Sequence, residues 1–138
     1  MSGRYEEWRC EMPATLDAVE HFCREFHVWR AGACRWLNSF SAELLLREAL
    51  TNSVLHGSFG DPRRRISCSL RVKPDRLVIA IRDEGEGFDW RRLWNRRGEP
   101  SDTHGRGIEI LRRYANLVRF NRAGNSVTIV KRFEAYGI

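Results

Sequence analysis

The segment from Ser41 to Gly57 constrains the fold more than any other part of the chain. Read at helical pitch, it carries an apolar stripe whose members recur every four residues, namely Leu46, Leu50 and Val54. A second stripe with the same spacing is polar and consists of Glu48, Asn52 and His56. The apolar stripe predicts a helix packed on a core. The separate polar stripe predicts that the same helix also presents side chains to a site.

The length and composition indicate a single globular domain spanning residues 1–138. No run approaches the roughly 18 apolar residues of a membrane helix, and the N-terminus lacks the apolar core of a signal peptide. We therefore expect a cytoplasmic protein without a membrane partner. The cysteines have no paired spacing and are expected to be buried free thiols: Cys10, Cys23, Cys34 and Cys68. A metal site of His21, Cys23, His27 and Cys34 matches no closed zinc template.

The formal charge of +6 raises the question of nucleic-acid binding. The arginine runs are scattered, however, over a turn, a loop and a helix, at 63–65, 91–92, 96–97 and 112–113. No recognisable nucleic-acid motif accompanies them. We interpret the charge as solvated faces with some contacts to an anionic ligand, and we expect no direct nucleic-acid partner.

The order of predicted elements is strand, helix, helix, hairpin, loop, helix, hairpin. Alternation and helical periodicity predict them at 8–12, 15–32, 41–56, 66–72 with 76–82, 108–115, and 117–121 with 126–133. Residues 84–105 are predicted to form a long loop, which in a compact domain is usually functional or mobile. Because helices and strands do not alternate strictly, we expect an α+β fold. It should be a two-layer sandwich whose mixed, mostly antiparallel sheet has its helices on one face.

Two glycine pairs flank the long loop. Gly85 and Gly87 follow Asp83 at the end of a predicted strand, and Gly105 and Gly107 precede the third helix. Glycine lets backbone N–H groups approach an anion closely, so the pairs suggest a phosphate ligand, although each alone is equally typical of a tight turn. The spacing is neither that of a P-loop nor that of a dinucleotide-binding fingerprint.

In combination and order, the segments 48–57, 83–88 and 104–107 resemble the nucleotide-binding domain of the GHKL superfamily, which has the Bergerat fold. Segments 48–57 and 83–88 are most similar to the stand-alone anti-sigma-factor serine kinases. The resemblance covers nearly the whole chain, from the first strand to Phe133. It implies a histidine-kinase-like ATPase domain that binds ATP and Mg²⁺, with an ATP lid at about 88–104.

The resemblance also implies roles that these side chains can perform. Asn52 would offer its amide oxygen to the magnesium ion, and Glu48 would be the catalytic base for the attacking hydroxyl. Asp83 would accept a hydrogen bond from the exocyclic amine of adenine, which guanine cannot donate there. Gly85 and Gly87 would let the base and sugar approach the backbone. His56, the third member of the polar stripe, is expected among the nucleotide-binding residues.

The remaining expected contacts lie later in the chain. Gly105 and Gly107 would present free N–H groups to the phosphates at the start of the third helix, with Arg106 between them. The terminal phosphate would be contacted by Arg96, Arg97 or Arg106. Ser126 would keep a hydroxyl near the adenine. Asn125 departs from the Gly-Thr-Thr-Val pattern usual at this place in the family.

By resemblance, the function is that of an ATP-dependent protein serine/threonine kinase that is also an anti-sigma factor. The implied partners are a sigma factor, an anti-anti-sigma protein of the STAS type as substrate, and a second copy of the chain in a homodimer. The alternatives are a nucleotide-binding regulatory module without kinase activity and a histidine-kinase-type ATPase domain. None of the four histidines has the context of a phosphoacceptor, and a plain ATPase would use additional domains.

Overall fold

The structure, a computed structural model, describes residues 6–58, 61–95 and 106–133. Its elements in chain order are β1 (Glu6–Pro13), α1 (Leu16–Ala33), α2 (Ser39–Asn52), the π-helical turn η1 (Ser53–Gly57), β2 (Arg65–Lys73), β3 (Arg76–Asp83), α3 (Trp90–Asn95), α4 (Arg106–Tyr114), β4 (Leu117–Phe120) and β5 (Ser126–Arg132). None of the described helices is long and apolar enough to cross a membrane.

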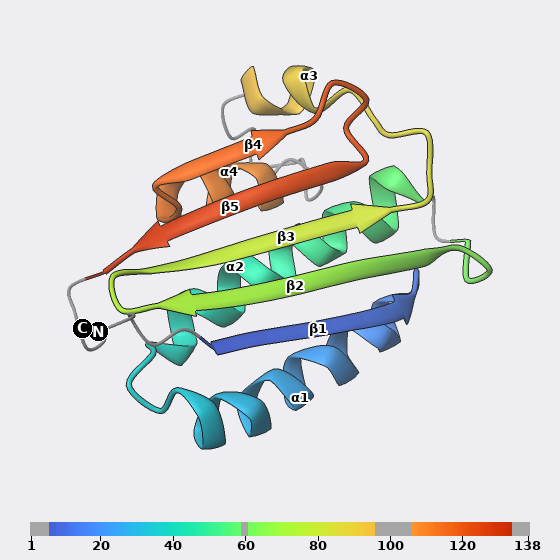
Figure 1. Cartoon of the computed structure of the whole chain (residues 1–138). Coiled ribbons are helices and arrows are strands. Elements are labelled where there is room, and N and C mark those ends of the chain that lie inside the picture. Colours follow the sequence, from blue (N-terminus) through green and yellow to red (C-terminus); the bar gives the residue numbers. More distant parts are fainter. Residues whose placement is uncertain (1–5, 59–60, 96–105, 134–138) are drawn as a thin grey trace.

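The strands form one sheet in the order β1-β2-β3-β5-β4, and the helices lie on one side of it (Figure 1). The predicted α+β fold with two layers and helices on one face is thereby confirmed. The expected mixture of parallel and antiparallel pairs is not found, because every pairing among the described strands is antiparallel. Two helices lie between β1 and β2, as the sequence predicted, and β1 pairs with β2 in the antiparallel direction. Between β3 and β4 the short α3 adds a second helix to the one that was predicted.

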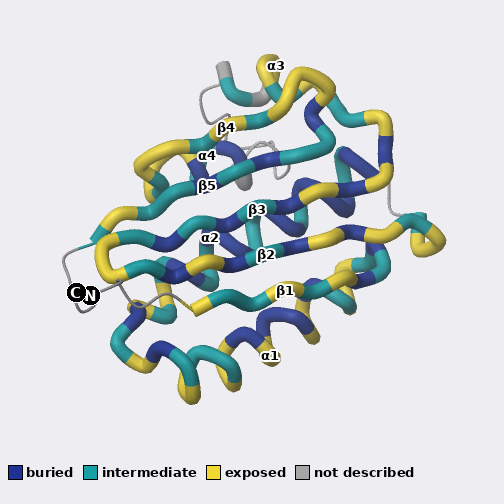
Figure 2. The backbone as a smooth tube through the Cα atoms, in the orientation of Figure 1, coloured by how far each residue is buried: buried dark blue, intermediate teal, exposed yellow. Residues whose placement is uncertain are grey.

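The core lies between the sheet and α1 and α2, where burial alternates along the central strands (Figure 2). Leu46, Leu50 and Val54 of the predicted apolar stripe are all buried. Thr15 caps α1 as expected, since its side chain accepts a hydrogen bond from the Ala18 N–H at 3.1 Å. Because the apolar stripe of α2 and η1 is buried in the core, the polar stripe on another face of the same segment points away from it.

Two local features differ from the sequence prediction. The second helix does not run to residue 56 as an α-helix: after Asn52 it widens into η1, where the Ser58 N–H reaches the Ser53 carbonyl at 2.9 Å. Such π-turns are frequent at functional sites. Within the predicted loop, residues 90–95 form α3, which the few apolar residues of that stretch did not reveal.

The cysteines meet the expectation of free thiols, of which Cys23, Cys34 and Cys68 are buried. Burial raises the pKa of Cys23 and of Cys34 to about 11. No group of three or more His, Cys, Asp or Glu side chains in the described ranges could hold a metal ion.

Candidate functional site

Asp83 ends β3 and lies against the end of η1. Its side chain is only 4% exposed, and its Oδ1 accepts a hydrogen bond from the Gly85 N–H at 2.7 Å. Gly57 makes this burial possible, because a Cβ atom added there would lie 2.7 Å from the Asp83 carboxyl carbon. Burial raises the pKa of Asp83, while the Gly85 N–H and Arg64 act in the opposite direction. The result is a buried acceptor at a strand end, in the place predicted for adenine recognition.

Gly85 and Gly87 form the turn that follows Asp83. A Cβ atom on Gly85 would lie 2.8 Å from the Gly57 carbonyl carbon, so the turn packs directly on η1. Gly87 has a φ of +93° and faces the backbone of Ala123. Both glycines therefore bring backbone segments together within the protein. Whether they also approach a ligand, as the sequence suggests, stays a prediction.

Asn125 connects the turn after Asp83 to the β4–β5 hairpin through hydrogen bonds. Its backbone carbonyl accepts from the Asp83 N–H at 2.9 Å, and its Nδ2 donates to the Gly85 carbonyl at 3.1 Å. Asn121 holds Asn125 in turn, donating from Nδ2 to its Oδ1 at 2.6 Å. We call Asn121 and Asn125 the asparagine clasp. The sequence showed Asn125 only as a departure from a pattern, although two Asn residues around Gly124 are typical of a hydrogen-bonded turn.

Asn52 lies at the end of α2 and is 5% exposed. Its Nδ2 is buried and has no hydrogen-bond partner among the described residues. It borders a cavity of about 10 Å³, which has room for about one water molecule and is also lined by Phe88, Phe120 and Ser126. A buried amide without a partner costs about 1–3 kcal/mol, so its presence calls for a ligand or an ordered water.

Glu48 lies one helical turn before Asn52 and is half-buried. Burial raises the pKa of its carboxyl group, and Arg47 only partly offsets this. Arg47 forms ion pairs with Glu20 and Glu43. Glu48 forms no ion pair with a described residue. The polar stripe of the sequence thus yields a carboxylate and an amide in neighbouring turns, each without a protein partner in the described ranges.

His56 lies on η1 and stacks on Phe88, with ring centroids 5.2 Å apart. Phe88 meets Phe120 edge to face at 5.8 Å, and Trp90 of α3 stacks on Phe120 at 5.0 Å. These contacts join the first residues after the Asp83 turn to β4. His56 therefore contacts Phe88, which lines the small cavity, and this aromatic contact was not predicted from the sequence.

The third helix begins where the second glycine pair was expected to place it. Helix α4 starts at Arg106 and includes Gly107, and Gly105 lies outside the described residues. The lid arginines Arg96 and Arg97 also lie outside them. Helix α4 packs on α2 through buried Ile108 and Leu111. Its N-terminus is therefore tied to the helix that carries Glu48 and Asn52.

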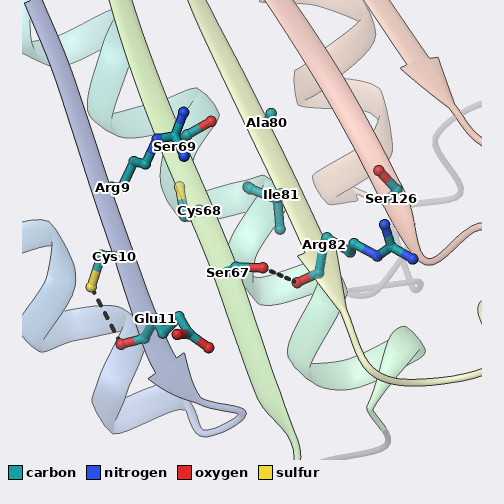
Figure 3. Close-up of a pocket in the computed structure, with 10 residues that line it drawn as sticks. All are labelled: Arg9, Cys10, Glu11, Ser67, Cys68, Ser69, Ala80, Ile81, Arg82 and Ser126. Atoms are coloured by element: carbon teal, nitrogen blue, oxygen red, sulfur yellow. Dashed lines mark hydrogen bonds between the residues drawn. The ribbon is translucent and has the colours of Figure 1, made fainter.

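The structure thus brings the expected residues together in two groups. Asn52 and Ser126 border one small cavity, and Asp83, Gly85 and Gly57 pack on one another at the end of η1. The largest hollow among the described residues lies elsewhere, on the other face of the sheet (Figure 3). Ser126 borders that hollow as well as the small cavity.

Comparison with known proteins agrees with this geometry. The family described as histidine kinase-like ATPase domain matches residues 12–131, and the chain belongs to that family. A 44-residue stretch is 36% identical to the anti-sigma F factor of Oceanobacillus iheyensis. The match covers 32% of this chain and 30% of that protein, so the chain spans about a third of the curated relative it matches.

Family membership implies that the domain binds ATP. The described residues fit this ligand on two observations, the buried Asn52 amide without a partner and the buried Asp83 carboxylate at a strand end. They also fit a magnesium ion held mainly by phosphate oxygens, since Asn52 offers one neutral oxygen and no protein cluster competes for the metal.

Proposed function

We propose that this histidine kinase-like ATPase domain is a protein serine/threonine kinase that acts as an anti-sigma factor and phosphorylates an anti-anti-sigma partner. One observation carries the proposal. A half-buried carboxylate of raised pKa, Glu48, stands one helical turn before the buried amide of Asn52. Binding alone does not require a carboxylate there. The similarity to an anti-sigma F factor supports the partner class.

In the proposed reaction, Asp83 accepts the adenine amine, and Asn52 offers its Oδ1 to magnesium. The bound metal would neutralise charge on the phosphates. Glu48 takes the proton from the serine hydroxyl while the hydroxyl oxygen bonds to the γ-phosphorus. The bond from that phosphorus to the β–γ bridging oxygen breaks, and ADP leaves with the electron pair. A raised pKa suits Glu48 to this role, because a base with a pKa nearer to neutrality accepts a proton more readily.

The partners belong to the same proposal. A sigma factor would be held by the domain and released when the anti-anti-sigma protein binds and is phosphorylated on serine. A homodimer is proposed with it. The alternatives are a regulatory module that binds nucleotide without turnover and an ATPase domain of the histidine-kinase type.

The test is phosphoryl transfer to a purified anti-anti-sigma protein from the same genome. After incubation with ATP and Mg²⁺, intact-mass spectrometry scores the phosphorylated partner, and fragmentation locates the residue. Glu48→Gln should slow transfer by about 10²–10⁴-fold while leaving ADP affinity unchanged, because it removes only the base. The matched control is Glu25→Gln, an exposed carboxylate on α1 that should have no effect.

Each result decides one point. Absence of phosphoserine with the wild-type domain, while ADP still binds, would favour the regulatory module. Phosphate on histidine would favour the histidine-kinase-type domain. Transfer by Glu48→Gln at the wild-type rate would leave the kinase standing without Glu48 as its base.

A further inference from the structure

The face of the sheet turned away from the helices, called here the outer face, meets the candidate nucleotide site only at Ser126, which borders both hollows. Alternation along each strand places every second residue on it, and no described helix covers it (Figure 1). Its centre holds small side chains, Ser67, Ser69 and Ala80. They leave a shallow hollow of about 730 Å³ between Arg9 and Arg82 (Figure 3).

Basic side chains that are scattered in the sequence gather on this face. Besides Arg65 at the start of β2 and Arg9 on β1, which pairs with Glu7, four exposed arginines lie on it: Arg71 from β2, Arg82 from β3, Arg119 from β4 and Arg132 from β5. None of these four forms an ion pair with a described residue. None belongs to the arginine runs visible in the sequence. Strand register therefore creates a charged surface that the order of residues along the chain conceals.

One row across the face places like charges directly opposite each other. Lys73 pairs with Arg76 across the β2–β3 ladder, and Arg76 pairs with Arg132 across the β3–β5 ladder. Like charges in such positions destabilise a sheet. Asp75 lies 3.9 Å from Arg76 but is exposed and offsets little of this. The carboxylates on the face itself, Glu7 and Glu11, both lie on β1 at its edge.

A second row is apolar. Val78, Val130 and Leu117 follow one another across β3, β5 and β4, and Leu117 is 45% exposed. An apolar strip bordered by arginines has the composition of a protein interface, where arginine is enriched and lysine depleted. A nucleic acid suits the face less well. The outward residues named above include no aromatic side chain on which a base could stack.

We propose that the outer face is a docking surface for an acidic segment of a partner protein. The partner's carboxylates meet the four exposed arginines and the Lys73–Arg76–Arg132 row, and its apolar side chains cover the Val78–Val130–Leu117 row. A second copy of this chain is a poor occupant, because pairing two such faces brings arginine against arginine. The proposal does not depend on kinase activity, since the nucleotide-binding residues lie at the helix side of the sheet.

The experiment uses the full chain and a fluorescent poly-L-glutamate peptide as probe, followed by fluorescence anisotropy near physiological ionic strength. The variant Arg71→Ser/Arg119→Ser/Arg132→Ser removes three arginines from the face. The matched control, Arg24→Ser/Arg35→Ser/Arg122→Ser, removes three exposed arginines elsewhere and has the same net charge. The proposal predicts that affinity falls about tenfold or more in the first variant and changes little in the control.

An NMR titration of the wild-type protein keeps the test valid if the triple variant folds poorly. Peptide addition should shift the backbone amides of Ser67, Ser69 and Thr128 and leave those of α1 unchanged. Equal losses in both triple variants, amide shifts spread over the whole surface, or no binding by the wild type would each overturn the proposal. Tighter binding of an oligothymidylate of equal charge would overturn it in favour of a nucleic acid, and peptide-independent dimerisation through this face in favour of a second copy.

Discussion

Replacing Gly57 by alanine tests the packing on which the position of Asp83 depends. The added Cβ would lie 2.7 Å from the Asp83 carboxyl carbon and closer still to Oδ2, whereas ordinary contact begins at 3.4 Å, so the carboxyl group must move by at least about 0.7 Å. A shift of that size is enough to lengthen the 2.7 Å bond from the Gly85 N–H beyond the normal limit of about 3.2 Å. Hydrogen bonds to charged groups contribute about 1.5–3 kcal/mol, so the free energy of unfolding should fall by that amount.

The same displacement moves the acceptor predicted for adenine. ADP affinity should therefore fall about ten- to a hundredfold in Gly57→Ala, measured by titration calorimetry beside urea denaturation. The matched control is Gly32→Ala in α1, where nothing lies within 4 Å of the added Cβ. Alanine favours a helix over glycine by up to about 1 kcal/mol, so the control should be as stable as the wild type or more stable. Wild-type stability and ADP affinity in Gly57→Ala would refute the reasoning.

Three further predictions concern the clasp, the buried acid and the thiols. Asn125→Asp removes the donor to the Gly85 carbonyl and should lower ADP affinity severalfold, at a cost of about 1 kcal/mol; unchanged calorimetry would show that the clasp does not position the turn. Burial raises the pKa of Asp83 above 3.8, so the carboxyl group binds its proton more tightly in the folded protein than in the unfolded chain. The free energy of unfolding therefore falls as the pH rises from 3.8 through the pKa of the folded state. Asp83→Asn should flatten the fall in stability as the pH rises above 3.8, and identical slopes for the two proteins in denaturation would contradict this prediction. Because burial raises the pKa of Cys23 and Cys34 to about 11, a thiol reagent should label them only on unfolding; rapid native labelling would show that they are accessible.

The sequence predicted the elements best where one period dominates over many residues. Both long helices, both hairpins and the burial of Leu46, Leu50 and Val54 follow directly from spacing. The π-turn at the end of α2 was not predictable, because it changes hydrogen bonding without changing the residue pattern. The expectation of some parallel pairs was wrong, because strand alternation shows which residues face the core but not the direction in which two strands pair.

For the site, sequence identified the residue types but not the contacts that hold them. Nothing in the spacing showed that Gly57 makes room for the Asp83 carboxylate, since the two are far apart in the chain. Asn125 read as a departure from a pattern, and the structure gives it hydrogen bonds to both ends of the Asp83 turn. The arginine surface of the outer face could not be predicted either, because its arginines are far apart in the sequence and only the pairing of β2 to β5 brings them together.

We propose that this domain binds adenine nucleotide through the buried carboxylate of Asp83. Titration calorimetry of ADP and GDP into the wild type and Asp83→Asn tests it most directly. We predict that the wild type binds ADP and discriminates against GDP, and that Asp83→Asn loses about 1.5–3 kcal/mol of ADP binding, or about ten- to a hundredfold in affinity. Equal ADP affinity in the two proteins, or no ADP binding by a folded wild type, would contradict the claim.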